Sequence, residues 1–315
     1  MKYFLALLTF LSFSITCTCQ DLRQGEGFVN VQGGRIWFKE IVNGEGIPLL
    51  VVHGGPGGRS CGSIAAYSLI SHERPVIVFD QLESGFSDSP GDTSLWKLSY
   101  FVEQITAIKN ALNLKEFHLL GSSWGAAIVI DYMLSANSEE VVSVIFSGPF
   151  LSTSKWMEDA KILLAELPVE IQDTIAKYEA LEQYDAPAYI AATNLFYSRY
   201  LSRTQWPPIN SPNCKGAKPF NSAIYNYMWG PTEFNATGTL INFDRTHRLH
   251  ELKLPVLFIA GEYDEVRVET LYSFQRMIEG AQCAIIPESG HAITTDQPEE
   301  YIQAISQFLN GVERQ

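Results

Sequence analysis

The sequence predicts an α/β fold: a mostly parallel sheet with helices on both faces and an inserted helical cap. Two patterns in the 315 residues support this prediction. Short, continuous apolar runs alternate with stretches of helical periodicity, and one long interval interrupts that alternation. Uninterrupted apolar runs are typical of strands covered on both faces, because both rows of side chains are then removed from water. With 46% apolar residues, the chain can bury a large core.

The first predicted element is an antiparallel hairpin, since GFVNVQGGRIWFKEI reads as two strands around Gly33 and Gly34. Six further strands are predicted at 48–52, 75–79, 117–120, 141–146, 256–260 and 283–286. Helical periodicity is clearest at 100–112, 126–134 and 299–309.

The interval 150–250 is predicted to be the cap, because it combines helical stretches with scattered prolines and many aromatic residues. In open α/β folds ligands bind at the carboxyl ends of the strands, so an insertion of this length is expected to lie over that edge. The chain then divides into a first core part, 20–149, the cap, and a second core part, 251–315.

Residues 1–19 read as a secretory signal peptide. Lys2 precedes an uncharged apolar run over 3–15, which is too short to span a bilayer permanently. Small residues at Cys17 and Cys19 permit cleavage before Gln20. We therefore expect an exported protein, periplasmic or extracellular, with no integral membrane span after signal removal. A lipid anchor at Cys17 or Cys19 is the alternative.

The net charge of −13 argues against a nucleic-acid partner, since little in the chain would neutralise phosphates. Three cysteines lie beyond the signal: Cys61, Cys214 and Cys283. Because their number is odd and their spacing is wide, no disulfide framework is predicted. Each is expected to be a small buried residue. His247 and His250 have helical spacing, but no carboxylate or thiol set completes a metal site around them.

A candidate nucleophile follows the strand at 117–120, which leads directly into GSSWGA and then a helix. This is the G-x-S-x-G nucleophile elbow in a strand–turn–helix setting, with Ser123 at its centre. Its glycines are needed because the tight turn leaves no room for a Cβ. The pattern alone is weak, and most of its specificity comes from that setting.

A second motif, HGGPGG, follows the strand at 48–52 and begins at His53. Adjacent glycines let the backbone approach a ligand closely, although the same letters also suit an ordinary turn. In this position a free N–H can point at a developing oxyanion. The N–H groups of Gly55 and Trp124 are therefore the candidate oxyanion hole.

An activated serine needs a base, and of the six histidines His291 has the expected place. It lies late in the chain, in the loop ESGHA between a strand and the final helix, as the order Ser…Asp…His requires. The acid that orients it must then come from a strand end between Ser123 and His291. Asp264 in GEYDEV is the candidate, because it follows the strand at 256–260, the first one predicted after the cap, whereas the strand at 283–286 leads into the loop of His291 itself.

Together these residues resemble the proline iminopeptidases and tricorn-interacting aminopeptidases, serine exopeptidases of the α/β-hydrolase fold. The resemblance covers nearly all of the mature chain. It is carried by HGGPG at 53–57, DQLESGFSD at 80–88, GSSWGA at 121–126, YMWGPTEF at 227–234, GEYDEV at 261–266 and SGH at 289–291.

The resemblance implies Ser123 as nucleophile, His291 as base and Asp264 as orienting acid. It also implies that Glu265 and Glu233 hold the free α-amino group of the substrate, which carboxylates can do through charge-assisted hydrogen bonds. A solvated cap residue is the alternative for Glu233, and a solvated loop still suits Glu262.

Three positions depart from the family pattern. Members often carry Gly at the position of Glu83, a basic residue at that of Phe86, and Gly at that of Ser122. None of these removes a catalytic group, but each bears on the shape of the pocket.

The expected function is a serine aminopeptidase that releases N-terminal proline, or another small apolar residue, from short peptides with a free N-terminus, without a cofactor or metal. One alternative is a cap-bearing hydrolase of esters or amino-acid amides, which would not need the two glutamates. Another is a catalytically silent binding protein on the same fold.

Overall fold

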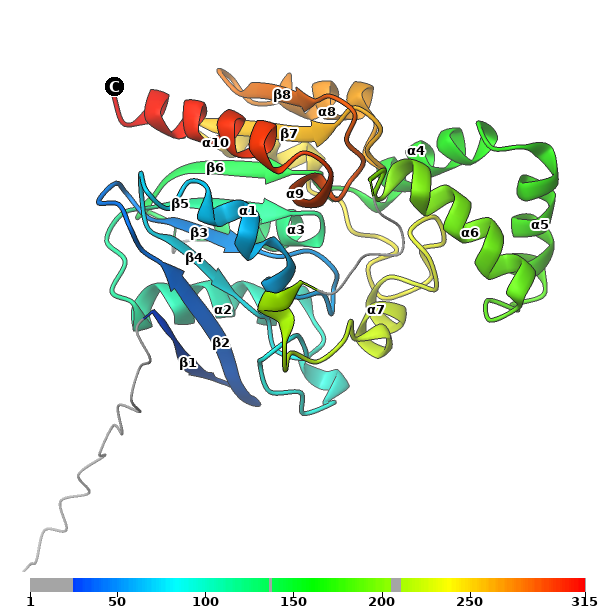
Figure 1. The fold of residues 1–315 in the computed structure, drawn as a ribbon, viewed down its shortest axis with the longest axis horizontal. Coiled ribbons are helices and arrows are strands. Elements are labelled where there is room, and N and C mark those ends of the chain that lie inside the picture. Colours follow the sequence, from blue (N-terminus) through cyan, green and yellow to red (C-terminus); the bar gives the residue numbers. More distant parts are fainter. Residues whose placement is uncertain (1–24, 136–137, 205–210, 315) are drawn as a thin grey trace, which may run out of the picture.

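The computed structural model describes residues 25–135, 138–204 and 211–314, and its centre is a twisted eight-stranded sheet (Figure 1). The strands are β1 (Glu26–Val31), β2 (Gly34–Ile41), β3 (Leu49–Val52), β4 (Val76–Phe79), β5 (Phe117–Ser122), β6 (Val141–Ser147), β7 (Val256–Gly261) and β8 (Gln282–Ile286). Their order in the sheet is β1-β2-β4-β3-β5-β6-β7-β8. β2 pairs antiparallel with β1 and β4, and the other pairs are parallel.

Helices cover both faces of this sheet. They are α1 (Ile64–Ser68), α2 (Leu98–Ala111), α3 (Trp124–Met133), α4 (Thr153–Ala165), α5 (Val169–Ala180), α6 (Pro187–Tyr200), α7 (Ser222–Met228), α8 (Val268–Gln275), α9 (Ile293–Asp296) and α10 (Pro298–Val312), with short 3-10 turns at Cys61–Ser63, Thr93–Leu95, Pro212–Cys214 and Thr246–Glu251.

The alternation of strand side chains divides the core into two layers. Leu50 and Val52 of β3 pack in the cluster that holds α2, α3 and α8, whereas Leu49 and Val51 pack in the cluster that holds α1 and α10. All four side chains are buried, which is why β3 reads as an uninterrupted apolar run.

The predicted α/β fold is confirmed. Each predicted strand and the hairpin at Gly33 and Gly34 overlaps an observed strand or pair, and the three clearest predicted helices overlap α2, α3 and α10. The predicted signal at 1–19, with Cys17 and Cys19, lies outside the described residues. Over the described ranges, no helix is both long enough and apolar enough to cross a membrane.

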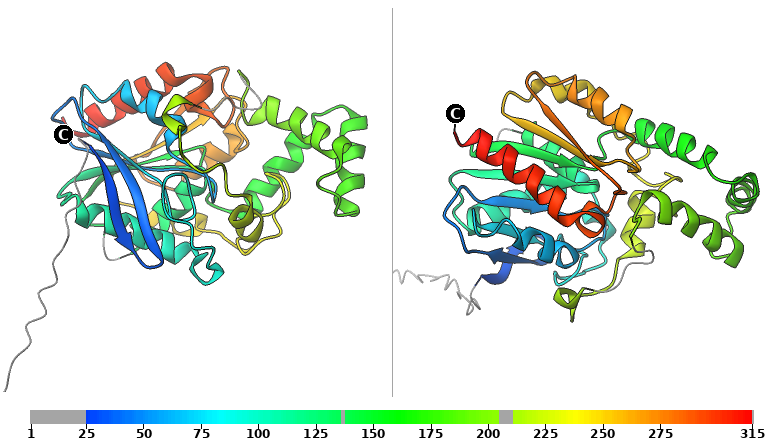
Figure 2. Two further views of the ribbon diagram at one scale, coloured as in Figure 1. Left: turned by 60° about the horizontal axis from the view of Figure 1, so that its bottom comes forward. Right: turned by 45° about the horizontal axis from the view of Figure 1, so that its top comes forward.

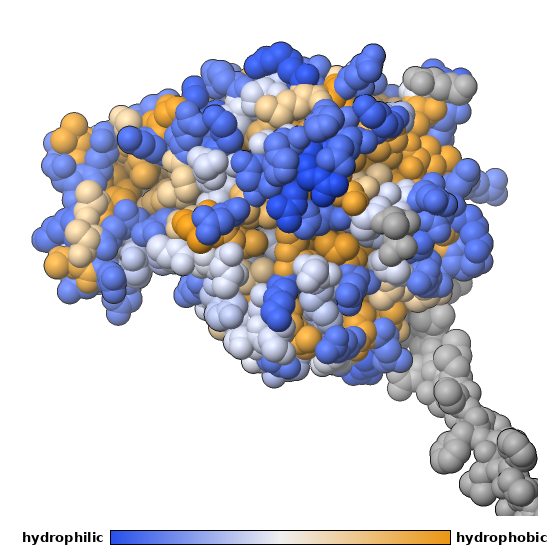
Figure 3. Space-filling view, turned by 180° about the vertical axis from the view of Figure 1, so that it is seen from behind, coloured by the Kyte–Doolittle hydropathy of each residue, from blue (hydrophilic) through white to orange (hydrophobic). Residues whose placement is uncertain are grey.

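Between β6 and β7 the described residues form four α-helices, α4 to α7, and two of the 3-10 turns. α4, α5 and α6 project to one side of the sheet and α7 lies nearer to its strand ends (Figures 1 and 2). The projecting helices share a small hydrophobic cluster of their own, which includes Leu163, Ile175 and Phe196. Seen from behind, apolar side chains are scattered among hydrophilic ones over these helices (Figure 3).

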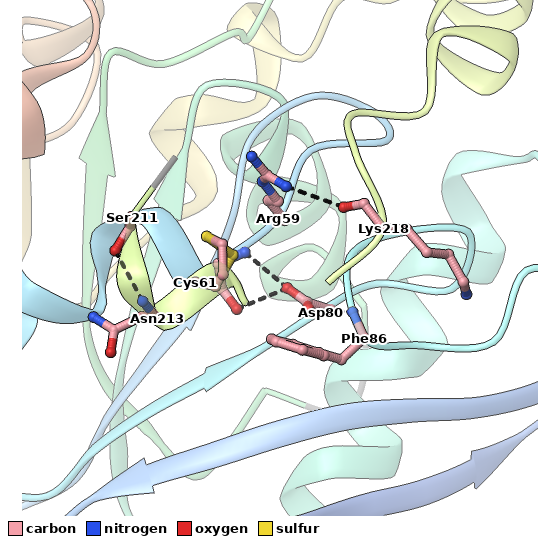
Figure 4. The surroundings of a disulfide bond; sticks show 9 residues. Arg59, Cys61, Asp80, Phe86, Ser211, Asn213 and Lys218 are labelled. Atoms are coloured by element: carbon pink, nitrogen blue, oxygen red, sulfur yellow. Dashed lines mark hydrogen bonds between the residues drawn. A yellow bond between two sulfur atoms is a disulfide. The ribbon is translucent and has the colours of Figure 1, made fainter. Parts of the chain in front are cut away.

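The prediction of no disulfide was wrong for two cysteines, although both are buried as expected. Cys61, which follows the HGGPGG motif, forms a disulfide with Cys214 across a sequence separation of 153 (Figure 4). Nothing local in the sequence reports such a pairing, because packing alone brings these two short turns together. Cys283 is a free, partly buried thiol, and burial raises its pKa to about 11.

Candidate active site

Ser123 sits on the turn between β5 and α3. Its backbone has φ 54° and ψ −122°, an unusual conformation for a residue with a side chain. Its N–H donates to the carbonyl of Ser147 at 2.9 Å, which ties the turn to the end of β6. A Cβ at Gly125 would lie 2.2 Å from the carbonyl oxygen of Val52, so only glycine allows α3 to start this close to β3.

The HGGPGG loop passes directly beside Ser123. A Cβ at Gly54 would lie 2.9 Å from the Cβ of Ser123, and Gly55 has φ +128°. Trp124 is the first residue of α3, so its N–H is one of the first-turn donors that have no acceptor within the helix. Gly55, Ser123 and Trp124 all line one small pocket, as a two-donor oxyanion hole requires.

A buried hydrogen-bond network fixes this loop to the elbow. Gln81 is its hub: its N–H donates to His53 Nε2 at 3.0 Å, and its side-chain amide donates to the His53 carbonyl at 2.8 Å. The Gln81 Oε1 accepts from the indole N–H of Trp124 at 3.0 Å. Burial lowers the pKa of His53, as suits a histidine that accepts a backbone hydrogen bond. Gln81 was not proposed from the sequence, although it lies in the motif DQLESGFSD.

His291 and Asp264 are joined by a short hydrogen bond. Nδ1 of His291 lies 2.6 Å from Oδ1 of Asp264, whose carboxylate also accepts from the N–H groups of Gly261 and Val266 at 3.2 Å. Burial by itself lowers the pKa of His291, but the negative charges of Asp264, Glu265 and Glu233 outweigh it and raise that pKa to about 9. His291 and Ser123 line the same cavity.

Gly148, just beyond β6, is a contact that sequence reasoning missed. A Cβ there would lie 2.8 Å from both Cε1 and Nδ1 of His291 and 3.2 Å from Oδ2 of Asp264. Its φ of +51° is also unfavourable for other residues. The imidazole therefore rests against bare backbone. The sequence signal was a glycine two residues after a predicted strand, which is too common to single out.

Glu265 is deeply buried without a partner. Its side chain is 2% exposed, and within the described part of the chain neither of its carboxylate oxygens has a hydrogen-bond partner. Burial, with the nearby charge of Glu233, raises its pKa well above the usual value. Burial likewise raises the pKa of Glu233. Burial, together with the charges of the two glutamates, also raises the pKa of Tyr197. Such a pair of carboxylates is stabilised by a cation between them.

The structure thus brings all seven proposed site residues into one region, and it separates the acidic cluster of GEYDEV. Asp264 and Glu265 point inward and are buried, whereas Glu262 is exposed and accepts from the N–H of Glu288 at 3.1 Å. In the described ranges, His, Cys, Asp and Glu do not gather in threes in a metal-binding arrangement.

The surroundings of Glu83 and Phe86 explain two of the three departures from the family pattern. Glu83 has φ 73°, which is why glycine suits this position, and its carboxylate accepts from Gly91 N–H at 2.7 Å and Trp96 Nε1 at 3.2 Å. Phe86 packs against Trp37 with 4.9 Å between ring centroids. Ser122 lines the main cavity.

The sheet order, the elbow after β5 and the histidine after β8 define an α/β hydrolase. Consistent with this, the family model described as alpha/beta hydrolase fold matches residues 47–298.

Curated relatives show to which family of α/β hydrolases the chain is similar. The proline iminopeptidase of Heyndrickxia coagulans is 40% identical over 291 residues, which cover 91% of this chain and 99% of that protein. That of Saccharolobus solfataricus is 29% identical and covers 95% and 97%. The crystal structure of proline iminopeptidase from Mycobacterium smegmatis superposes with a TM-score of 0.80 at 28% identity, covering 91% of this chain and 98% of that one. The chain belongs to the proline iminopeptidase family of α/β hydrolases, and these relatives support an aminopeptidase.

Proposed function

We propose that the protein is a serine aminopeptidase that releases N-terminal proline, or another small apolar residue, from short peptides through an acyl-enzyme. The observation that carries this proposal is the pair Glu233 and Glu265 beside the Ser123 cavity. Glu265 has a buried carboxylate with no hydrogen-bond partner in the described chain, and a bound cation would stabilise its charged form. The ammonium group of a free N-terminus is such a cation, and it lies one residue from the bond to be cut.

The reaction follows from the arrangement. Ser123 Oγ attacks the carbonyl carbon next to the scissile bond while His291 Nε2 takes its proton, and Asp264 holds Nδ1–H so that Nε2 is the accepting nitrogen. The N–H groups of Gly55 and Trp124 donate to the oxyanion. The tetrahedral intermediate then expels the amine, which receives the proton from His291. A water activated by His291 hydrolyses the acyl-enzyme and restores Ser123.

The preference for a small apolar or cyclic residue is supported by the small pocket beside the candidate oxyanion hole. Its walls include Phe150, Trp156, Trp229 and Leu240, and Glu233 also lines it. Phe150 packs edge-on against Trp229 with 5.2 Å between centroids. Aromatic faces pack well against a pyrrolidine ring, and the carboxylate of Glu233 on the same wall is a suitable partner for the nitrogen of that ring.

A panel of aminoacyl arylamides, each with a free and an N-acetylated amino group, tests the proposal. We expect turnover of the free forms, with proline among the best, and loss of at least about a hundredfold in kcat/KM on acetylation. Equal rates on the blocked forms would contradict the aminopeptidase assignment and favour a general ester or amide hydrolase. Labelling by a fluorophosphonate probe should vanish in Ser123→Ala, and no labelling of the wild type would indicate a silent fold.

We also propose that the protein is exported. The disulfide Cys61–Cys214 supports this, because disulfides persist mainly in oxidising compartments. Cell fractionation of the full chain tests it, and recovery of all protein in the cytoplasm would contradict it. Recovery in the membrane fraction that is lost when Cys17 and Cys19 are both changed to Ser would indicate the lipid-anchored alternative.

A further inference from the structure

The main cavity extends well beyond the groups used in the proposed reaction. It has a volume of about 600 Å³ and reaches from Ser123, His291 and Glu233 to Arg59 on the HGGPGG loop. Among the described residues that line it, Glu233 is the one carboxylate and Arg59 the one side chain with a permanent positive charge. The cavity therefore carries opposite charges at different places on its wall.

Residues with uncharged hydroxyl groups also line the cavity. They include Ser63, Tyr67, Ser122, Ser147, Thr294 and Tyr301. Several form a chain, since Tyr301 donates to Ser147 Oγ at 3.0 Å and the hydroxyls of Tyr67 and Tyr301 lie 3.4 Å apart. Hydroxyls both donate and accept, so such a wall can satisfy the amide groups of a peptide backbone without demanding a charge.

The backbone that carries Arg59 is held on its C-terminal side (Figure 4). The N–H and Oγ of Ser60 both donate to Asp80 Oδ1 at 2.7 Å, and Cys61 is fixed by the disulfide to Cys214. Arg59 Nη1 donates to the carbonyl of Lys218 at 3.1 Å. A guanidinium held in this way keeps a defined position at little further entropic cost.

The neighbouring cation, Lys218, is engaged elsewhere. Its ammonium donates to the carbonyl of Ser87 and to Ser89 Oγ, and Lys218 is not among the residues that line the cavity. Of these two cations, Arg59 is the one that lines the cavity.

We propose that Arg59 binds the C-terminal carboxylate of the substrate, so that the enzyme prefers dipeptides and tripeptides with a free C-terminus. This inference rests on the proposed function, which places the substrate ammonium at Glu233 and Glu265. A free short peptide carries an ammonium at one end and a carboxylate at the other, and the cavity offers one partner for each. An extended chain gains about 3.3–3.6 Å per residue, so each added residue carries the carboxylate further from Ser123 and past a fixed guanidinium.

Matched peptide pairs test the inference. The substrates are prolyl-alanine and its C-terminal amide, followed by free-acid peptides with two to five alanines after proline. We expect kcat/KM about tenfold higher for the acid than for the amide, as for loss of one charge-assisted hydrogen bond. Within the free-acid series, kcat/KM should fall beyond the tripeptide.

Variants of Arg59 test whether this residue causes the preference for the free acid over the amide. In Arg59→Gln the acid-to-amide ratio should fall to about one, whereas Arg59→Lys should keep part of it. Arg276→Gln changes the net charge equally at an exposed site beyond α8 and should keep the full ratio. Taking ratios within each variant removes any general effect on folding.

The outcomes separate this inference from the function it rests on. Absence of turnover on all free aminoacyl arylamides overturns the aminopeptidase proposal itself. If arylamides are cleaved but wild type treats acid and amide alike, or Arg59→Gln keeps the preference, or rates are flat with peptide length, then the role of Arg59 alone is overturned.

Discussion

Three carboxylates surround the imidazole of His291, and their roles differ. Asp264 is hydrogen-bonded to the ring at 2.6 Å, whereas Glu265 and Glu233 act on it through charge. The raised pKa of His291 favours its protonated form, which does not accept the proton of Ser123. A bound substrate ammonium would offset the two glutamates and lower the pKa of His291, so substrate binding would also prepare the base.

This coupling predicts a shift in the pH profile. Glu265→Gln removes a negative charge that raises the pKa of His291, so the acidic limb of kcat/KM should move to lower pH, by about one pH unit. The variant should also bind substrate more weakly. Glu262→Gln, on the exposed side of the same turn, should leave the limb in place. The measurement is kcat/KM of one arylamide across pH, and an unmoved limb in Glu265→Gln would contradict the coupling.

Gly148 gives a second prediction at this scale. In Gly148→Ala the new methyl would lie 2.8 Å from the ring of His291 and push it away from Asp264. We expect kcat to fall about 10- to 100-fold, because small displacements of catalytic groups are costly. Gly280→Ala is the control, since Gly280 has φ +76° but a Cβ there would meet no atom of the described residues within 4 Å. If both variants lose the same activity, crowding of His291 is not the cause.

At the scale of elements, the end of α6 meets the loop that carries His291. The N–H groups of His291 and Ala292 donate to the carbonyls of Tyr200 and Leu201 at 2.8 and 2.6 Å, which satisfies acceptors that the helix end leaves open. Asp296, the last residue of α9, accepts from Gly290 N–H at 2.9 Å and from Arg203 N–H at 2.9 Å. The cap is therefore attached to the catalytic loop by backbone hydrogen bonds and by the carboxylate of Asp296.

Asp296→Asn should weaken the attachment of the cap to the catalytic loop. The side-chain amide of Asn would place N–H donors against backbone N–H groups that need an acceptor. We expect the free energy of unfolding to fall by about 3 kcal/mol, since several charge-assisted bonds converge on this carboxylate. Urea denaturation measures it, with Asp173→Asn on the exposed side of α5 as the control. Equal stability of the two variants would argue against the role of Asp296.

The same contact has a pH dependence. Burial alone would raise the pKa of Asp296, but the hydrogen bonds that its carboxylate accepts from backbone N–H groups lower that pKa below its usual value. Its contribution to stability is therefore present above the pKa of an unfolded Asp and is lost as the pH falls through the folded value. In Asp296→Asn this part of the acid destabilisation should be absent.

At the scale of the whole molecule, one covalent bond joins the two parts of the main cavity wall. Cys61 follows the HGGPGG loop, while Cys214 precedes the segment that supplies Phe220 and Tyr225 to the wall. The link spans 153 residues of sequence, so it restricts the unfolded chain strongly. It also limits how far the two walls can separate.

The double variant Cys61→Ser/Cys214→Ser should therefore unfold more easily, by about 2–4 kcal/mol. We further expect KM for short peptides to rise more than kcat falls, because the wall and not the catalytic group is released. Calorimetry and steady-state kinetics measure the two effects, and Cys283→Ser serves as the control. An unchanged transition temperature in the double variant would contradict a structural role for the bond.

Local pattern alone was enough for the fold and for the triad candidates. The strands at 75–79 and 256–260 can be predicted because a buried parallel strand must be apolar throughout. The turn GSSWGA can be predicted because a nucleophile elbow must have glycines beside its serine. The order of Ser123, Asp264 and His291 followed from the strand order, and the structure joins Asp264 to His291 by a hydrogen bond.

Contacts between distant residues were decided only by tertiary structure. The pairing of Cys61 with Cys214, the approach of Gly148 to His291, the hub at Gln81 and the position of Arg59 on the wall of the main cavity have no local signal. The sequence by itself determined which strands and turns form, because those depend on the nearest neighbours in the chain. Which side chains meet depends on how the helices pack on the sheet, and that packing buries Glu265 without a partner in the described chain while leaving Glu262, three residues earlier, in water.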